Sequence, residues 1–190
     1  MPDLPLYAGI PTELNAKTNQ YCGVVYKLRP FPFACLTAQC SWNEEVVYRF
    51  TGNPDGWAPN AHLVSDPAGN LYVTSSTPDL CGHGQGNVFS LSAPDWNPST
   101  LASFQGRFLS WITTDALGNV YGTNAYGGSD GNVFKLTCCW TYTDLHDFTG
   151  SPNDGQGPAA APVVDAQGNI YGTTAYGGAY GYGVVWKISP

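Results

Sequence analysis

The sequence predicts an all-β fold, a β-propeller-like tandem repeat of four-stranded antiparallel meanders with about three and a half blades. A phrase containing Tyr between apolar and small residues recurs at Leu6–Gly9, Leu71–Thr74, Val120–Thr123 and Ile170–Thr173. An Asp-x-x-Gly-Asn segment precedes the last three copies, and its asparagines lie 49 and 50 residues apart. That period is long enough for one four-stranded unit. The chain also holds 23 Gly and 15 Pro, only 11% of it is charged, and no window shows a helical apolar stripe.

Three further phrases supply the other strands of each unit. An alternating strand follows each Tyr phrase at Gly23–Leu28, Gly86–Leu91, Gly131–Leu136 and Gly183–Ile188. A strand ending in Phe-x-Gly comes next, at Val47–Gly52, Leu101–Gly106 and Leu145–Gly150. A last strand precedes each Asp-x-x-Gly-Asn segment, at Ala61–Ser65, Leu109–Thr113 and Ala161–Val164. Such alternation, rich in β-branched and aromatic residues, is typical of half-buried strands, and meanders of this length are typical of propeller blades.

The Asp-x-x-Gly-Asn segments predict tight turns between strands. Their positions are Asp66–Asn70, Asp115–Asn119 and Asp165–Asn169. Asn and Gly tolerate positive φ, and an Asp side chain accepts hydrogen bonds from backbone amides two residues on. Calcium is the functional alternative, because Asp and Asn oxygens are hard ligands. One carboxylate per turn is too few for a calcium cage, so we favour the structural interpretation.

The chain is predicted to form a single repeat-built domain over residues 1–190. Its units are residues 6–70, 71–119 and 120–169, followed by a half unit at 170–190. The phrases predict fourteen strands, and both ends of the chain carry the same two phrases, so the ends do not complete one shared blade. Three outcomes stay open: a fragment of a longer array, an irregular closure, or exposed edges that pair with another copy as a ring or filament.

The six cysteines favour disulfides over a metal site. They are Cys22, Cys35, Cys40, Cys81, Cys138 and Cys139. Cys35 with Cys40 is the favoured bridge, Cys22 with Cys81 would link neighbouring units, and adjacent Cys138 and Cys139 either form a vicinal disulfide or reach other partners. Six cysteines allow about 15 connectivities, so the pairing stays open. No Cys-x-x-Cys spacing supports a metal, and disulfides predict an oxidising, extracellular compartment.

The net charge of −7 argues against nucleic acid and anionic membranes as partners, because both require clustered cations. No apolar run approaches the roughly 18 residues that span a bilayer, so membrane insertion is not expected. The first residues, Met1–Pro5, lack the basic and apolar regions of a signal peptide.

The motifs together resemble the GloVer repeat over nearly the whole chain. The match is best at Asp165–Ile188, the Asp-Gly-x-x-Pro element stands at Asp55–Pro59 and Asp154–Pro158, and Cys22-Gly23 matches the Cys-Gly that often opens the alternating strand. The second unit departs from the pattern, since no Asp-Gly-x-x-Pro loop follows Gly106. The resemblance implies a tandem-repeat protein, secreted or anchored at the surface of bacteria. The family is defined by its repeat, so the resemblance leaves the function open.

No catalytic signature is present. The histidines His62, His83 and His146 lie in three different phrases, and only His83, in a glycine-rich loop, is a candidate site residue. Carboxylates that an acid/base pair of the glycosidase kind would use are Glu44, Glu45, Asp144 and Asp147. Their spacing does not bring two of them together, and no P-loop, Gly-x-Ser-x-Gly or His-Glu-x-x-His motif occurs. We therefore predict no catalytic residue, no cofactor and no metal.

Aromatic residues separate into recurrent and loop positions. The recurrent ones, which we assign to packing between blades, are Tyr26, Phe89, Phe134 and Trp186, then Tyr7, Tyr72, Tyr121 and Tyr171, and finally Trp42, Trp96 and Trp140. The candidate ligand-binding residues are Tyr126, Tyr176, Tyr180, Tyr182, Trp57, Asn124, Thr174 and His83. Flat rings beside glycines stack on sugars, and Asn or Thr side chains bind hydroxyls. The same tyrosines would equally cover sheet ends or line a subunit contact.

The sequence as a whole predicts a non-catalytic, extracellular structural or adhesive interaction module that self-assembles through exposed half-blade edges. Its partner is itself, as a homo-oligomeric ring or filament, or a longer repeat array. The first alternative is a carbohydrate-binding, lectin-like propeller with glycans as partners, and the second is a carbohydrate-active enzyme.

Overall fold

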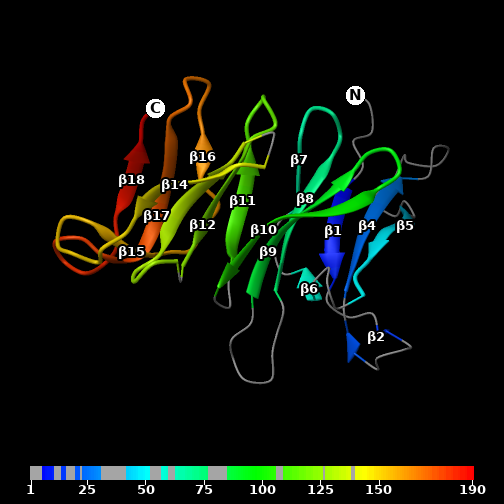
Figure 1. Cartoon of the computed structure of the whole chain (residues 1–190), viewed down its shortest axis with the longest axis horizontal. Helices are drawn as coiled ribbons and strands as arrows, with labels where there is room; N and C mark the ends of the chain where they lie inside the picture. Colours follow the sequence, from blue (N-terminus) through cyan, green and yellow to red (C-terminus); the bar gives the residue numbers. More distant parts are fainter. Residues whose placement is uncertain are drawn as a thin grey trace.

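The computed structural model describes residues 6–10, 14–15, 20–21, 23–30, 42–51, 57–59, 63–76, 85–105, 109–125, 127–137 and 140–190. The described residues form strands and turns and contain no helix, which confirms the predicted all-β, propeller-like class. Four main antiparallel sheets follow one another along the chain and lie in a row, with the first and fourth sheets at opposite ends (Figure 1). The row does not close on itself.

The strands of each sheet are contiguous in sequence. The first sheet contains β1 (Leu6–Ile10), β4 (Val24–Pro30) and β5 (Trp42–Arg49), and a separate hairpin pairs β2 (Leu14–Asn15) with β3 (Gln20–Tyr21). The second contains β6 (Trp57–Pro59), β7 (Val64–Ser65), β8 (Leu71–Ser76), β9 (Gln85–Ser92) and β10 (Asn97–Gln105). The third contains β11 (Leu109–Thr114), β12 (Val120–Asn124), β13 (Asn132–Leu136) and β14 (Tyr142–Asp147). The fourth contains β15 (Gly155–Pro158), β16 (Val163–Val164), β17 (Ile170–Gly177) and β18 (Val185–Ile188).

The fourteen predicted strands are all present, but the sheets group them differently from the sequence units. The strand before each Asp-x-x-Gly-Asn turn pairs with the Tyr strand that follows the turn, as β7 does with β8. The second, third and fourth sheets therefore begin before the Tyr strand that opens their sequence units. Among the described residues, the first sheet therefore has no strand in the first position of the meander, and the fourth sheet has none in the last position.

Successive sheets pack face to face through two hydrophobic clusters. Between the first and second sheets lie the buried residues Val25, Phe50, Leu71, Val73, Phe89 and Leu91. Between the second and third sheets lie Tyr72, Val88, Ile112, Val120, Phe134 and Leu136. In β9, Phe89 packs against the first sheet and Val88 packs against the third sheet. Full burial of such side chains stabilises the fold by about 1.5–3 kcal/mol each.

The Asp-x-x-Gly-Asn turns form the hydrogen bonds that the structural interpretation requires. Asp115 Oδ1 accepts hydrogen bonds from the backbone amides of Leu117 and Asn119, while Oδ2 accepts from Asn119 Nδ2 at 2.7 Å and from the Tyr121 hydroxyl at 3.1 Å. The turns at Asp66 and Asp165 repeat the bonds to Asn and Tyr. Gly118 has a φ of 80°, which favours glycine. Each carboxylate therefore accepts hydrogen bonds from the residues that follow it in its own turn and strand, as the structural interpretation requires.

These bonds shift the ionisation of the turns. Burial alone would raise the pKa of Asp66 and Asp115, but the hydrogen bonds that each carboxylate accepts hold the pKa below its ordinary value of 3.8. Burial raises the pKa of Tyr72, and the hydrogen bond to Asp66 raises it further. The turns at Asp66 and Asp115 therefore each hold an ionised Asp against a neutral Tyr.

Candidate functional site

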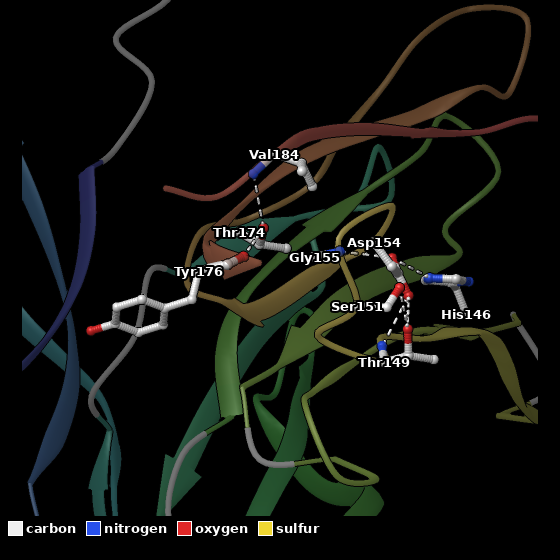
Figure 2. Close-up of polar contacts among 8 residues, drawn as sticks. All are labelled: His146, Thr149, Ser151, Asp154, Gly155, Thr174, Tyr176 and Val184. Atoms are coloured by element: carbon white, nitrogen blue, oxygen red, sulfur yellow. Dashed lines mark hydrogen bonds and ion pairs between the residues drawn. The ribbon is translucent and has the colours of Figure 1, made fainter. Parts of the chain in front are cut away.

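Three of the predicted ligand-binding tyrosines are strongly exposed. The exposed fractions of Tyr176, Tyr180 and Tyr182 are 62%, 87% and 93%. Tyr176 belongs to β17, and the other two lie in the loop that joins β17 to β18. The Tyr176 ring points away from the sheet (Figure 2). We call these three residues the tyrosine loop.

Two polar residues predicted to bind a ligand are instead buried within their sheets. Asn124 and Thr174 are 3% and 7% exposed. The Thr174 hydroxyl donates to the Tyr176 carbonyl at 2.9 Å and accepts from the Val184 amide at 3.1 Å, as Figure 2 shows. Thr174 thus orders the end of β17 and the approach to β18.

Other predicted site residues fall outside the described part of the structure. These are Tyr126, His62, His83 and the cysteines Cys22, Cys35, Cys40, Cys81, Cys138 and Cys139. The backbone of Trp57 lies in β6, and its side chain is outside the described residues. Their roles in ligand binding and disulfide formation stay predictions.

His146 has a carboxylate partner that the sequence did not indicate. His146 Nε2 lies 3.2 Å from Asp154 Oδ1 across the turn after β14. The same carboxylate accepts from the Thr149 amide and hydroxyl and from the Gly155 amide (Figure 2). Burial alone would raise the pKa of Asp154, but these bonds lower it below 3.8.

The hydrogen bonds that Asp154 accepts hold the turn between β14 and β15 together, and they do not form a catalytic triad. The Ser151 hydroxyl contacts the Thr149 hydroxyl at 3.2 Å, whereas a Ser-His-Asp triad requires the serine beside the imidazole. Of the other predicted carboxylates, Asp144 accepts a hydrogen bond from Asn132, and Glu44 and Glu45 are exposed on β5. No group of three His, Cys, Asp or Glu side chains that could hold a metal occurs within the described ranges.

The strongest anomaly in burial lies on β18. Val185 is 82% exposed, whereas its counterparts Val25, Val88 and Val133 in the other three sheets are 0% exposed. Val163 is 65% exposed, and it stands directly opposite Tyr171, which in turn stands opposite Lys187. Side chains two apart on a strand share a face. Val163, Tyr171, Val185 and Lys187 therefore form one surface, the open face of the fourth sheet.

A second surface that no described sheet covers lies at the other end of the row. It contains Tyr26, Leu28, Trp42 and Glu44, and we call it the open face of the first sheet. Tyr26 and Leu28 are partly buried, Trp42 is 48% exposed, and Glu44, opposite Leu28, is exposed. The equivalent residues of the third sheet are Phe134, Leu136, Trp140 and Tyr142. All four contact second-sheet residues: Phe134 and Leu136 in the core cluster, Trp140 with its ring centroid 5.8 Å from that of Tyr72, and Tyr142 with its centroid 5.6 Å from that of Phe104.

The two open faces carry opposite charges. Lys187 Nζ lies 5.5 Å from the centroid of the Tyr171 ring, the same arrangement as Lys135 over Tyr121 at 5.2 Å. Glu44 supplies a carboxylate on the open face of the first sheet. The sequence placed Tyr171 and Lys187 on strands but began the strand near Glu44 only at Val47, whereas β5 begins at Trp42. The sequence also carried no signal of which strand faces other sheets would leave uncovered.

The comparisons with known proteins leave the family open. No family model and no curated protein matches the chain. Among solved structures, the chain is similar to TolB from Acinetobacter baumannii, at 12% sequence identity and a TM-score of 0.42. The match covers 90% of this chain and 47% of that one, so this chain spans about half the length of the structure that it matches. A likeness this distant says nothing about what the chain binds.

Proposed function

We propose that the chain is a non-catalytic, extracellular structural interaction module that assembles end to end. In this arrangement the open face of the fourth sheet packs against the open face of the first sheet of a second copy. The single observation that carries the proposal is Val185, which is 82% exposed where its three counterparts are fully buried. An exposed apolar position that its own repeat buries elsewhere is expected to have a partner.

The internal interfaces supply a template for the contact. Between the second and third sheets, Tyr72 and Val88 meet Phe134 and Leu136, and Trp140 lies against Tyr72. By equivalence, Tyr171 and Val185 would meet Tyr26 and Leu28 of the second copy, with Trp42 against Tyr171. Lys187 would approach Glu44, an attraction between opposite charges that favours this orientation.

The two faces differ from each other, so the contact is heterologous. Heterologous contacts give rings when the rotation closes and filaments when it does not. The resemblance to a secreted tandem repeat supports the same function, because a neighbouring repeat in an array would use the same face. Disulfides and an extracellular location belong to this proposal as well.

Light scattering of the pure protein, with electron microscopy of the same sample, tests the proposal. We expect particles larger than one chain at high concentration. Val185→Glu should abolish them, because it places a charge in the contact without disturbing a buried position. Gln167→Glu, an exposed change in the turn before β17, is the matched control and should leave assembly intact. A wild-type monomer at all concentrations would overturn the proposal.

The exposed tyrosine loop supports a second candidate function, glycan binding. Tyr180 and Tyr182 are 87% and 93% exposed, and aromatic rings of this kind stack on sugar faces. We expect Tyr180→Ala and Tyr182→Ala to reduce retention on an immobilised polysaccharide panel. Leu117→Ala, at an equally exposed apolar residue in another turn, is the control. Equal retention of all variants would exclude this candidate.

A further inference from the structure

We infer that the outer edge of β18 is a site that accepts an extended segment as an added strand. The segment would have the pattern of Val47–Gly52, in which an aliphatic residue is followed three positions later by Phe and five positions later by Gly. The segment would pair antiparallel with β18 and supply the last strand of the fourth sheet. This goes beyond the proposed function, because the ligand binds backbone groups at an edge and need not belong to a second copy.

The other three sheets hold such a segment at the equivalent edge. β5 pairs with β4, β10 with β9, and β14 with β13, all antiparallel. The register shifts at the same place in each pair, which leaves one aliphatic residue of the last strand as the bulge: Val47, Leu101 or Leu145. A Phe stands three residues after each bulge. In the described structure no strand pairs with the outer edge of β18.

The Phe of each segment is anchored at both its backbone and its ring. The Phe50 amide donates to the Gly23 carbonyl at 3.0 Å, and the Phe148 amide donates to the Gly131 carbonyl at 2.9 Å. Gly183 is the equivalent glycine before β18. The Phe50 ring belongs to one core cluster with Val25, the counterpart of Val185, so a Phe paired to the edge of β18 would cover Val185. The ring contacts of Phe50 with Phe89 and of Phe148 with Trp186, at 5.6 and 5.8 Å, are made to the following sheet, which the fourth sheet lacks within the described residues.

The backbone of β18 is oriented to accept a strand. The Val184 amide and carbonyl both bond to Thr174 of β17, at 3.1 and 3.0 Å. Because backbone groups of successive strand residues point to opposite sides, those of Val185 and Lys187 point to the open edge. The Gly183 amide donates to the Gly177 carbonyl at 3.0 Å, so only its carbonyl is the counterpart of the Gly23 and Gly131 acceptors. An unpaired edge of this kind is a template for strand addition, in which main-chain bonds give affinity and side-chain pockets give specificity.

A labelled synthetic peptide with the sequence of residues 142–150 tests the site by fluorescence anisotropy. We expect saturable binding, at least tenfold weaker when the peptide carries Phe148→Ala. A peptide that is N-methylated at the Phe amide should bind equally weakly, because it cannot donate a hydrogen bond to the Gly183 carbonyl. Binding that is indifferent to both changes, or absent up to about 1 mM, would overturn the inference.

On the protein side, Val185→Pro should abolish peptide binding. Proline at an edge position with an outward amide leaves the pairing with β17 intact, and circular dichroism checks the fold. If this variant does not fold, hydrogen exchange of the wild type decides instead: the peptide should protect the amides of Val185 and Lys187, and unchanged exchange would overturn the site. The Glu44→Lys variant, impaired only at the opposite face, should bind the peptide normally, which separates this inference from end-to-end assembly.

Discussion

Gly122 shows how one missing side chain sets the packing between the strands of a sheet. It stands opposite Phe134, whose ring lies across the glycine. A Cβ at this position would overlap the tip of the Phe134 ring and would lie 3.0 Å from Ile112 Cγ2. Gly172 opposite Trp186 repeats the arrangement in the fourth sheet.

We therefore expect Gly122→Ala to destabilise the fold by about 1–3 kcal/mol, the usual cost of overpacking. Urea denaturation measures it. The double variant with Phe134→Leu should lose less stability than the two single variants lose together, because the smaller side chain relieves the overlap. Full additivity would show that the overlap is not the cause.

The ionised turns predict sensitivity to acid. Hydrogen bonds to the carboxylates hold the pKa values of Asp66, Asp115 and Asp165 below 3.8, so the unfolded chain binds protons more readily than the folded one. The stabilisation is complete above pH 3.8 and is lost as the pH falls through the folded pKa values.

Asp115→Asn tests this window. At pH 7 the variant should be less stable by about 1–3 kcal/mol, because the amide cannot accept all four hydrogen bonds. The difference from wild type should shrink below pH 3.8, as followed by thermal unfolding across pH. A constant difference would assign the effect to something other than ionisation.

The turn between β14 and β15 depends on one carboxylate. Asp154 accepts from Thr149, Gly155 and His146, whereas its neighbour Asn153 is exposed and makes no such bond. Asp154→Asn should raise hydrogen exchange at the Thr149 and Gly155 amides while global stability falls by less than about 1 kcal/mol. Asn153→Ala should leave exchange unchanged.

The strands were predictable because each phrase carries its own alternation and turn residues. The pairing across each Asp-x-x-Gly-Asn turn was predictable too, because such a turn closes a tight hairpin, as between β7 and β8. The sequence units were counted from the Tyr strand, so the strand before each turn was assigned to the preceding unit. The pair of His146 with Asp154 was missed because the two residues belong to different phrases. The uncovered Val185 was missed for a different reason: period-2 patterns show which side chain is apolar, but not whether another sheet will cover it.

The whole molecule is a row of four sheets with unlike ends, so the charges at those ends permit a mixing experiment. Lys187→Glu and Glu44→Lys should each weaken end-to-end assembly about two- to fivefold, in line with an exposed ion pair. A one-to-one mixture of the two variants should recover assembly, because opposite charges then meet at every contact. Failure of the mixture in light scattering would exclude the Lys187–Glu44 contact.

The unlike ends also give any assembly a direction. A copy carrying Val185→Glu keeps a working first sheet, so it can join a growing chain of copies but offers nothing for the next copy to join. Such a molecule acts as a terminator, and a minor fraction of it would set the length of a filament.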